Sequence, residues 1–229
     1  GKGVLITSNS KAASNNETGY TIDGTIDING ANGLGTFVNY GHTVVNSGGQ
    51  ILTENGVGVY GVNGSRVENK AGGLISVGTA LTQENIGIIG LSEKKKIGAE
   101  ADDNFGFKVN GALTAVNITN SGDLEVTGNK SMGIYADNNV ASPNKAKVLV
   151  VNEGKIEVTG DETTGIYVNT GTITLKDSNN IIVGKDGKGV YGKNSDLAVG
   201  NTSITVGDNG VGLLFEGTTT VNPYGGAGK

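Results

Sequence analysis

Short runs in which hydrophobic and polar residues alternate recur along the chain, and each run is followed by a turn and by a phrase like Gly-Ile-Tyr. The clearest copy reads Asn-Glu-Gly-Lys-Ile-Glu-Val at 152–158 and Gly-Ile-Tyr at 165–167. A second copy reads Asn-Ser-Gly-Asp-Leu-Glu-Val at 120–126 and Gly-Ile-Tyr at 133–135. Alternation with a period of two residues is typical of a β-strand with one buried face. Self-similarity at a spacing of roughly 20–50 residues indicates a solenoid.

The repeats predict an all-β fold in which residues 1–229 form one right-handed parallel β-helix. Short strands cannot bury a core singly, but stacked repeats form parallel sheets with rungs roughly 4.8 Å apart. From the number of repeated phrases we expect about seven to nine rungs. The alternation predicts these inward residues: Ile28, Val77, Val126, Ile156, Val158, Val183 and Val206. The aliphatic residue before each aromatic should also point inward: Val59, Ile134, Ile166 and Val190.

Two segments interrupt the repeat, and we predict that they are loop insertions near 91–108 and 137–147. Within the first, we interpret Gly106-Phe107 as a degenerate extra rung. Insertions in a solenoid loop out from one edge, often on the binding face. The alternative is that both are solvated loops without a specific function.

Equivalent positions of the repeats should form columns along the rod. One column is aromatic, continued by Ile89 and Leu214, and consists of Phe37, Tyr60, Tyr135, Tyr167 and Tyr191. Alternation turns it outward, where it could bind sugar rings or a partner protein, or could stack on itself for stability alone. A second column should be an amide ladder that locks the turns, made by Asn46, Asn69, Asn120 and Asn152.

Composition and charge narrow the function classes. The chain has 41 Gly but only 2 Pro, so its glycines are not those of a disordered Pro/Gly linker. The net charge of −5 and the single arginine, Arg66, argue against nucleic-acid binding. The chain has no apolar run of roughly 18 residues, so we expect no direct membrane insertion. The absence of cysteine fits export through an oxidising compartment, where a premature disulfide would block passage. No signal peptide opens the sequence, so an exported protein of this kind would be represented here by a piece of a longer chain.

Candidate catalytic chemistry is sparse. The single histidine, His42, lies in a predicted turn without evident metal-binding neighbours. Asp161, Asp186 and Asp208 recur at what we interpret as equivalent turn positions, where they could collect Ca²⁺ or act only as turn formers. No nucleophile, phosphate-loop or Cys/His metal motif is present. We therefore predict no enzymatic activity and no cofactor or metal.

The first insertion carries the predicted ligand-binding residues. It holds the only basic cluster of this acidic chain, with two carboxylates shortly after it: Lys94, Lys95, Lys96, Asp102 and Asp103. The regular faces of a solenoid repeat the same surface, whereas a loop on a rigid scaffold can build a distinct one. The cluster could contact acidic glycans or an acidic partner surface.

The phrases at 120–135 and 152–167 resemble the passenger repeats of large bacterial autotransporter (type V) adhesins, most closely the RadD-type surface adhesins of fusobacteria. The resemblance covers nearly the whole chain and is weakest over 91–110. It implies a virulence-associated, secreted passenger segment held at the surface of a Gram-negative cell by a C-terminal outer-membrane β-barrel that these residues do not include. It also implies attachment to a protein or glycan of a host or bacterial cell surface, and we expect a monomer. The alternatives are a glycan-processing β-helix enzyme and an inert spacer or fibre solenoid.

Overall fold

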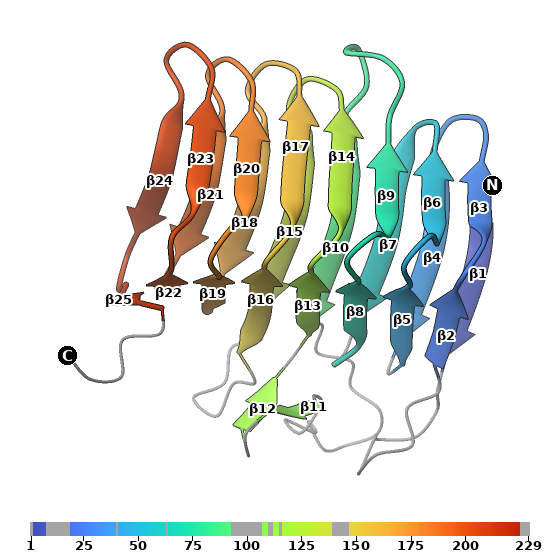
Figure 1. Cartoon of the computed structure of the whole chain (residues 1–229), viewed down its shortest axis with the longest axis horizontal. Coiled ribbons are helices and arrows are strands. Elements are labelled where there is room, and N and C mark those ends of the chain that lie inside the picture. The colour runs from blue at the N-terminus through green and yellow to red at the C-terminus, as the bar shows by residue number, and fades with distance from the viewer. Residues whose placement is uncertain are drawn as a thin grey trace, which may run out of the picture.

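The computed structural model describes residues 2–7, 19–39, 41–62, 64–92, 107–109, 112–114, 116–138 and 147–224. Every regular element in these residues is a β-strand, and nearly all belong to three parallel sheets. The chain visits the sheets in turn, rising along the front of the rod and descending along the back while it advances from the N-terminal to the C-terminal end (Figure 1). This sense of winding is right-handed, so the predicted right-handed parallel β-helix is confirmed.

Sheet A has eight strands, each of which contains a Gly-Ile-Tyr phrase or its equivalent. In spatial order the strands are β1 (Lys2–Thr7), β4 (Gly33–Asn39), β7 (Gly56–Val62), β10 (Ile86–Ser92), β15 (Met132–Asn138), β18 (Thr164–Asn169), β21 (Lys188–Lys193) and β24 (Val211–Glu216).

Sheet B has eight strands, and it supplies the side of each rung that the sequence indicated least clearly. Its strands are β2 (Gly19–Ile22), β5 (His42–Val45), β8 (Arg66–Asn69), β13 (Asn117–Asn120), β16 (Val148–Asn152), β19 (Gly171–Leu175), β22 (Asp196–Val199) and β25 (Val221–Pro223).

Sheet C holds the alternating Ile-x-Val runs. Its seven strands are β3 (Thr25–Ile28), β6 (Gln50–Thr53), β9 (Leu74–Val77), β14 (Asp123–Thr127), β17 (Lys155–Thr159), β20 (Asn180–Val183) and β23 (Ser203–Val206). Each lies between one strand of sheet B and one of sheet A along the chain, which gives seven complete rungs, with β1 before them and β25 after them. The predicted range of seven to nine rungs is therefore confirmed.

The core lies between the three sheets and is almost entirely aliphatic. Of the predicted inward residues, Val77, Val126, Ile156, Val158 and Val183 are at most 3% exposed. Ile28, in the first rung, is 8% exposed, and the aliphatic residues before the aromatic column are fully buried.

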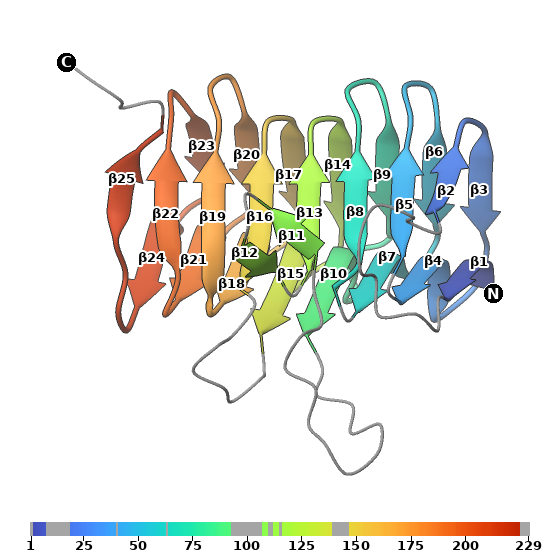
Figure 2. The same ribbon diagram turned by 90° about the horizontal axis from the view of Figure 1, so that it is seen from below.

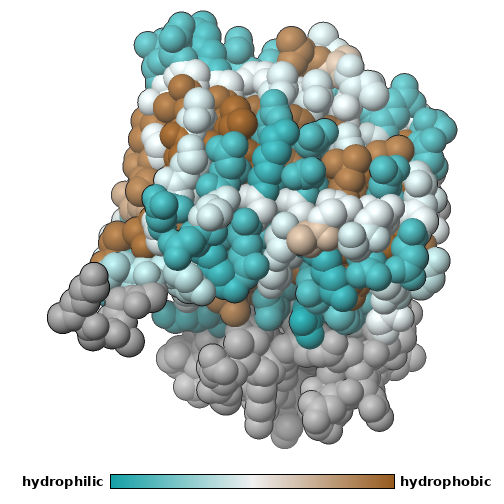
Figure 3. Space-filling view, in the orientation of Figure 1, coloured by the Kyte–Doolittle hydropathy of each residue, from teal (hydrophilic) through white to brown (hydrophobic). Residues whose placement is uncertain are grey.

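The last rung has an incomplete core, because no strand beyond it covers the inward residues. Val206, predicted to point inward, is only partly buried. Leu213 and Val221, which are aligned with the buried Val190 and Leu197, are 44% and 58% exposed. In the space-filling view, hydrophobic surface gathers toward this C-terminal end of the rod (Figure 3).

The glycine of each Gly-Ile-Tyr phrase is required by close packing rather than by a turn. A Cβ added to Gly165 would lie 2.5 Å from the carbonyl oxygen of Gly189 in the next rung and 2.5 Å from Cγ2 of Ile181. Gly133 meets the same obstacles one rung earlier, at 2.5 Å from Gly165 O and 2.6 Å from Ile156 Cγ2. Their φ angles are not positive, so steric exclusion alone selects glycine here.

The interpretation of Gly106-Phe107 as an extra rung is wrong. Phe107–Val109 forms β11, which pairs antiparallel with β12 (Ala112–Thr114) in a separate two-stranded sheet. In sheet A, β10 pairs directly with β15, so no rung lies between them. Both views place this hairpin outside the rod, over the outer face of sheet B (Figures 1 and 2).

Candidate functional site

The predicted aromatic column exists on the outer face of sheet A. The strand register pairs its members in one continuous row: Leu5, Phe37, Tyr60, Ile89, Tyr135, Tyr167, Tyr191 and Leu214. Leu5, which is 69% exposed, was missed because its phrase Gly3-Val4-Leu5 lacks the aromatic residue. The aromatic members are half-buried, since the rungs before and after each side chain cover part of it.

The rings of the column contact one another. Tyr135 and Tyr167 are stacked, with centroids 5.1 Å apart and planes 15° apart. Tyr167 and Tyr191 also lie 5.1 Å apart, but their planes are inclined by 71°, and Phe37 meets Tyr60 edge to face at 5.5 Å. Such pairs contribute about 0.5–1.5 kcal/mol beyond the area they bury. The column therefore stabilises the rod, whatever else it contacts.

A row of polar residues runs beside the tyrosines, two residues further along each strand, and sequence analysis did not identify it. It consists of Asp137, Asn169, Lys193 and Glu216. The hydroxyl of Tyr135 donates to Asp137 Oδ2 at 3.2 Å, and Asn169 Nδ2 donates to Asp137 Oδ1 at 2.9 Å. The offset of two residues on one strand face could have revealed this row.

These contacts shift the titration of the tyrosines. Burial and the neighbouring Asp137 carboxylate raise the pKa of Tyr135 to about 12. Burial, followed by the charge of Asp137, raises the pKa of Tyr167. The hydrogen bond from Tyr191 to the Glu216 carboxylate is the main cause of a raised pKa at that hydroxyl. All three phenols are therefore neutral donors near neutral pH.

The long connections of the rod leave from one corner, where sheet A passes to sheet B. Elsewhere along this corner the strands are joined by only a few residues, for example 194–195 between β21 and β22. Three connections are much longer: 8–18, 93–116 and 139–147. The predicted insertion bounds were 91–108 and 137–147, so the first connection ends eight residues later than predicted. The predicted ligand residues Lys94, Lys95, Lys96, Asp102 and Asp103 lie outside the described residues.

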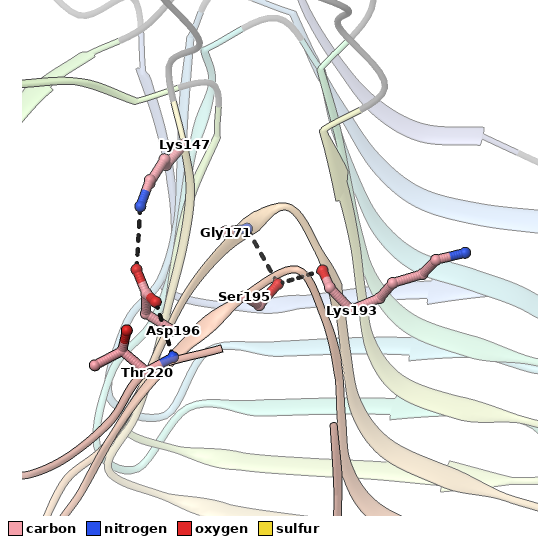
Figure 4. A network of polar contacts seen from close by, with 6 residues as sticks. All are labelled: Lys147, Gly171, Lys193, Ser195, Asp196 and Thr220. Carbon is pink, nitrogen blue, oxygen red and sulfur yellow. Dashed lines mark hydrogen bonds and ion pairs between the residues drawn. The ribbon is translucent and has the colours of Figure 1, made fainter. Parts of the chain in front are cut away.

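Polar contacts secure this corner next to the second insertion (Figure 4). Lys147, directly before β16, forms an ion pair of 3.1 Å with Asp196 on β22, two strands away in sheet B. The hydrogen bond from Lys147 lowers the pKa of Asp196. The buried Ser195 hydroxyl accepts a hydrogen bond from the Gly171 N–H at 3.1 Å and lies 2.8 Å from the Lys193 carbonyl oxygen, to which it donates. The end of the insertion is therefore fixed across neighbouring rungs.

The amide ladder has three members rather than four. Asn69, Asn120 and Asn152 are fully buried and in register. The Nδ2 groups of Asn69 and Asn120 each donate to the Oδ1 of the next asparagine at 2.9 Å. Asn46 was predicted wrongly: Val45 pairs with Asn69, so Asn46 lies one residue beyond the column. Its side chain instead donates to Asp23 Oδ1 at 2.8 Å.

The proposed acidic column is also out of register. Thr164, Lys188 and Val211 are aligned in sheet A, and the residues three positions before them are Asp161, Lys185 and Asp208. Lys185, and not Asp186, therefore occupies this position in the middle rung. Asp186 occupies the neighbouring left-handed position, with φ of 55°. Within the described residues no group of three or more His, Asp or Glu side chains could hold a metal ion.

His42 begins strand β5 instead of lying in a turn, and its side chain is 16% exposed. Its Nε2 lies 3.6 Å from Glu68 Oε2, and Arg66 Nη2 lies 3.1 Å from the same carboxylate oxygen. Arg66 and Glu68 thus form an ion pair on the outer face of sheet B, with His42 beside it.

Comparison of the chain with protein-family models, with curated proteins and with solved structures gives no match. In the part of the chain that the structure describes, no helix is long and apolar enough to cross a membrane.

Proposed function

We propose that this chain is a non-enzymatic segment of a cell-surface adhesin, in which a rigid β-helical rod presents recognition surfaces to another cell. One observation carries the proposal: all three long connections leave the rod at the corner between sheets A and B. Non-repeating sequence is thereby displayed along one edge of a regular scaffold, an arrangement that solenoids use for binding. The resemblance of the repeats to autotransporter passengers supports the same function.

The rigidity of this scaffold follows from its packing. Parallel strands are paired rung to rung on all three sides, and the aliphatic core is continuous from Ile22 to Leu197. A loop attached to such a frame loses less conformational entropy on binding than one attached to a mobile segment. The ion pair between Lys147 and Asp196 shows how one such loop is held at its base.

We place recognition first on the 93–116 connection, which contains the Lys94–Lys96 cluster. The test is adhesion of beads coated with the intact chain to host and bacterial cells. Deletion of residues 92–103 with a short Gly/Ser closure should reduce the number of bound beads several-fold. Replacing the three lysines by glutamine keeps the loop length and should give a smaller loss that is also produced by added salt.

Control beads should carry the Lys70→Gln variant, which removes one exposed lysine from a different corner. Its adhesion is expected to equal that of the parent. If the deletion variant folds, as judged by its circular dichroism, and adheres as well as the parent, recognition does not reside in this loop. If the intact chain adheres to no cell type, the adhesin proposal itself is wrong.

A further inference from the structure

We propose that the outer face of sheet A over β18 and β21 binds a carboxylate-bearing oligosaccharide. In this proposal Lys188 pairs with the acid group, Tyr191 packs against a sugar ring, and Lys193 and Asn169 contact hydroxyls. The inference rests on the proposed adhesive function and names a ligand class for it. It places this ligand on the rod itself and not on the long connections.

The side chains of β21 alternate so that three of them reach solvent. Lys188 and Tyr191 are half-buried and Lys193 is exposed, whereas Gly189, Val190 and Gly192 are buried. On β18 the aligned residues are Thr164, Tyr167 and Asn169. Thr164 is only 5% exposed, so β18 presents Tyr167 and Asn169 to solvent, whereas β21 presents Lys188, Tyr191 and Lys193.

The two lysines of this face supply unpaired positive charge. Among the described residues, the side chains of Lys188 and Lys193 form no ion pair or hydrogen bond. On the other faces, by contrast, Lys147, Lys155 and Lys176 are each paired with a carboxylate. The carboxylates of Asp137 and Glu216 lie in the same row as Lys193, so local attraction for an anion is centred on Lys188.

The charges of the face also orient the ligand. Glu216 is aligned with Lys193 in the next rung, and its carboxylate accepts a hydrogen bond from the Tyr191 hydroxyl. An acid group would be repelled at that edge. Lys188 lies at the opposite edge, five residues and up to roughly 16 Å along the strand, a span that fits several linked sugars better than one.

The aromatic geometry favours a sugar on Tyr191. Tyr135 and Tyr167 cover each other as parallel rings, so their facing surfaces are unavailable. Tyr191 is inclined by 71° to Tyr167 and has Leu214 as its other neighbour, so no parallel ring covers it. The C–H groups of a pyranose can pack on such a ring while its hydroxyls bond to the flanking amide and ammonium groups.

Other ligand classes fit this face less well. A protein partner needs an apolar centre, whereas Lys188 and Lys193 flank the centre of this face and its apolar neighbours Val211 and Leu214 lie to one side. Leu34, Val57 and Ile86 lie toward the other end of sheet A. Nucleic acid requires a basic stripe that neutralises many phosphates, and this face has two lysines. An elongated, singly charged polymer with alternating apolar and hydroxyl-bearing surfaces matches the rows best.

The test is titration of the intact chain with sialyllactose, an acidic trisaccharide, and with neutral lactose, followed by NMR or calorimetry. The acidic sugar should bind and lactose should bind much more weakly. Lys188→Gln should weaken binding roughly fivefold and abolish most of its salt dependence. Tyr191→Leu, which copies the neighbouring Leu214, should weaken it several-fold. The matched control is Lys70→Gln, which removes a remote lysine whose side chain has no ion pair within the described part of the chain, and it should change nothing.

Equal binding of lactose and sialyllactose overturns the inference, as does unchanged binding by Lys188→Gln. Sialylated glycolipid in neutral vesicles and a sialylated glycoprotein should be bound alike, whereas binding only to anionic vesicles without sugar contradicts the inference. Cell adhesion that neither sialyllactose nor Lys188→Gln reduces refutes this site but leaves the adhesin proposal standing. Binding of sialyllactose by a chain that adheres to no cell supports the site and refutes the adhesin proposal.

Discussion

Replacing Gly165 by alanine should lower the free energy of unfolding by about 2–3 kcal/mol, the upper part of the range for overpacked sites. The new Cβ would lie 2.5 Å from two atoms, whereas carbon atoms pack best at roughly 3.5–4.0 Å. One obstacle is the backbone carbonyl of Gly189 in the next rung, and the other is Cγ2 of the fully buried Ile181. Neither can move without disturbing the strand pairing or the core.

Gly212 provides the matched control, because it occupies the same column in the last rung. There an added Cβ would have only Ile204 Cγ2 within reach, at 4.0 Å. Gly212→Ala should therefore be neutral or should stabilise the protein by about 0.4–1 kcal/mol through the unfolded state.

Urea unfolding followed by far-UV circular dichroism measures the difference between the two variants. In thermal scans, a loss of this size at Gly165 corresponds to a melting temperature roughly 4–12 °C lower. If both variants change stability equally, or Gly165→Ala has no effect, the glycine column is not explained by close approach between rungs.

Four further predictions concern the core, the ladder, the tyrosines and metal. Val158→Asp should cost several kcal/mol by burying an unpaired charge, whereas Val206→Asp in the open last rung should cost much less; equal melting temperatures would count against this register. Asn120→Ala should destabilise by about 2–3 kcal/mol, because it leaves buried amide partners unsatisfied, and urea unfolding measures the loss. The pKa of Tyr135 in the folded state is raised from 10.0 to about 12. The stability that this shift contributes is therefore complete below pH 10 and is lost as the pH rises toward 12. Asp137→Asn should lower the pKa of Tyr135, which a spectrophotometric titration measures. A chelator should leave the melting temperature unchanged, and a large drop would revive the calcium hypothesis.

The sequence predicted best where every rung uses the same spacing. In sheets A and C the period-two alternation and the close-packed glycine recur without shifts, so the inward residues and the aromatic column follow directly from the pattern. Every predicted member of the column from Phe37 to Leu214 is in register, including Ile89, which interrupts the aromatic series. Binary patterning fixes the register wherever one face is buried.

Prediction failed where turn lengths vary. Asp161 and Asp186 each lie three residues after the aligned Val158 and Val183, but Asp208 lies two residues after Val206. The turn after Val158 is one residue longer than the other two, so the alignment at the next strand separates Asp186 from Asp161 and Asp208. Asn46 was misplaced for a different reason: β5 has Val45 at the position where the aligned β8 has Asn69, so the asparagine of this rung falls one residue later, in the turn. The Gly-aromatic pair at 106–107 could not reveal its antiparallel partner, since a dipeptide carries no periodicity.

The polar row beside the tyrosines was missed because its chemistry differs at every rung. Asp137, Asn169, Lys193 and Glu216 share a position but no residue type, so a search for repeated residues passes over them. Only the strand pairing makes them neighbours. Specific chemistry on a solenoid is most readily found where the geometry repeats and the residue type does not.

The direction of the strand pairing has a mechanical consequence. Each strand is bonded to the rungs before and after it, so these bonds run along the rod, and β1 and β25 lie at its opposite ends (Figure 1). Tension between the ends loads one strand at a time. A single rung such as 165–188 occupies roughly 4.8 Å of rod when folded but up to roughly 80 Å when pulled straight. Under load the rod should therefore lengthen in steps, one rung at a time, and each step should absorb part of the work of a sudden pull.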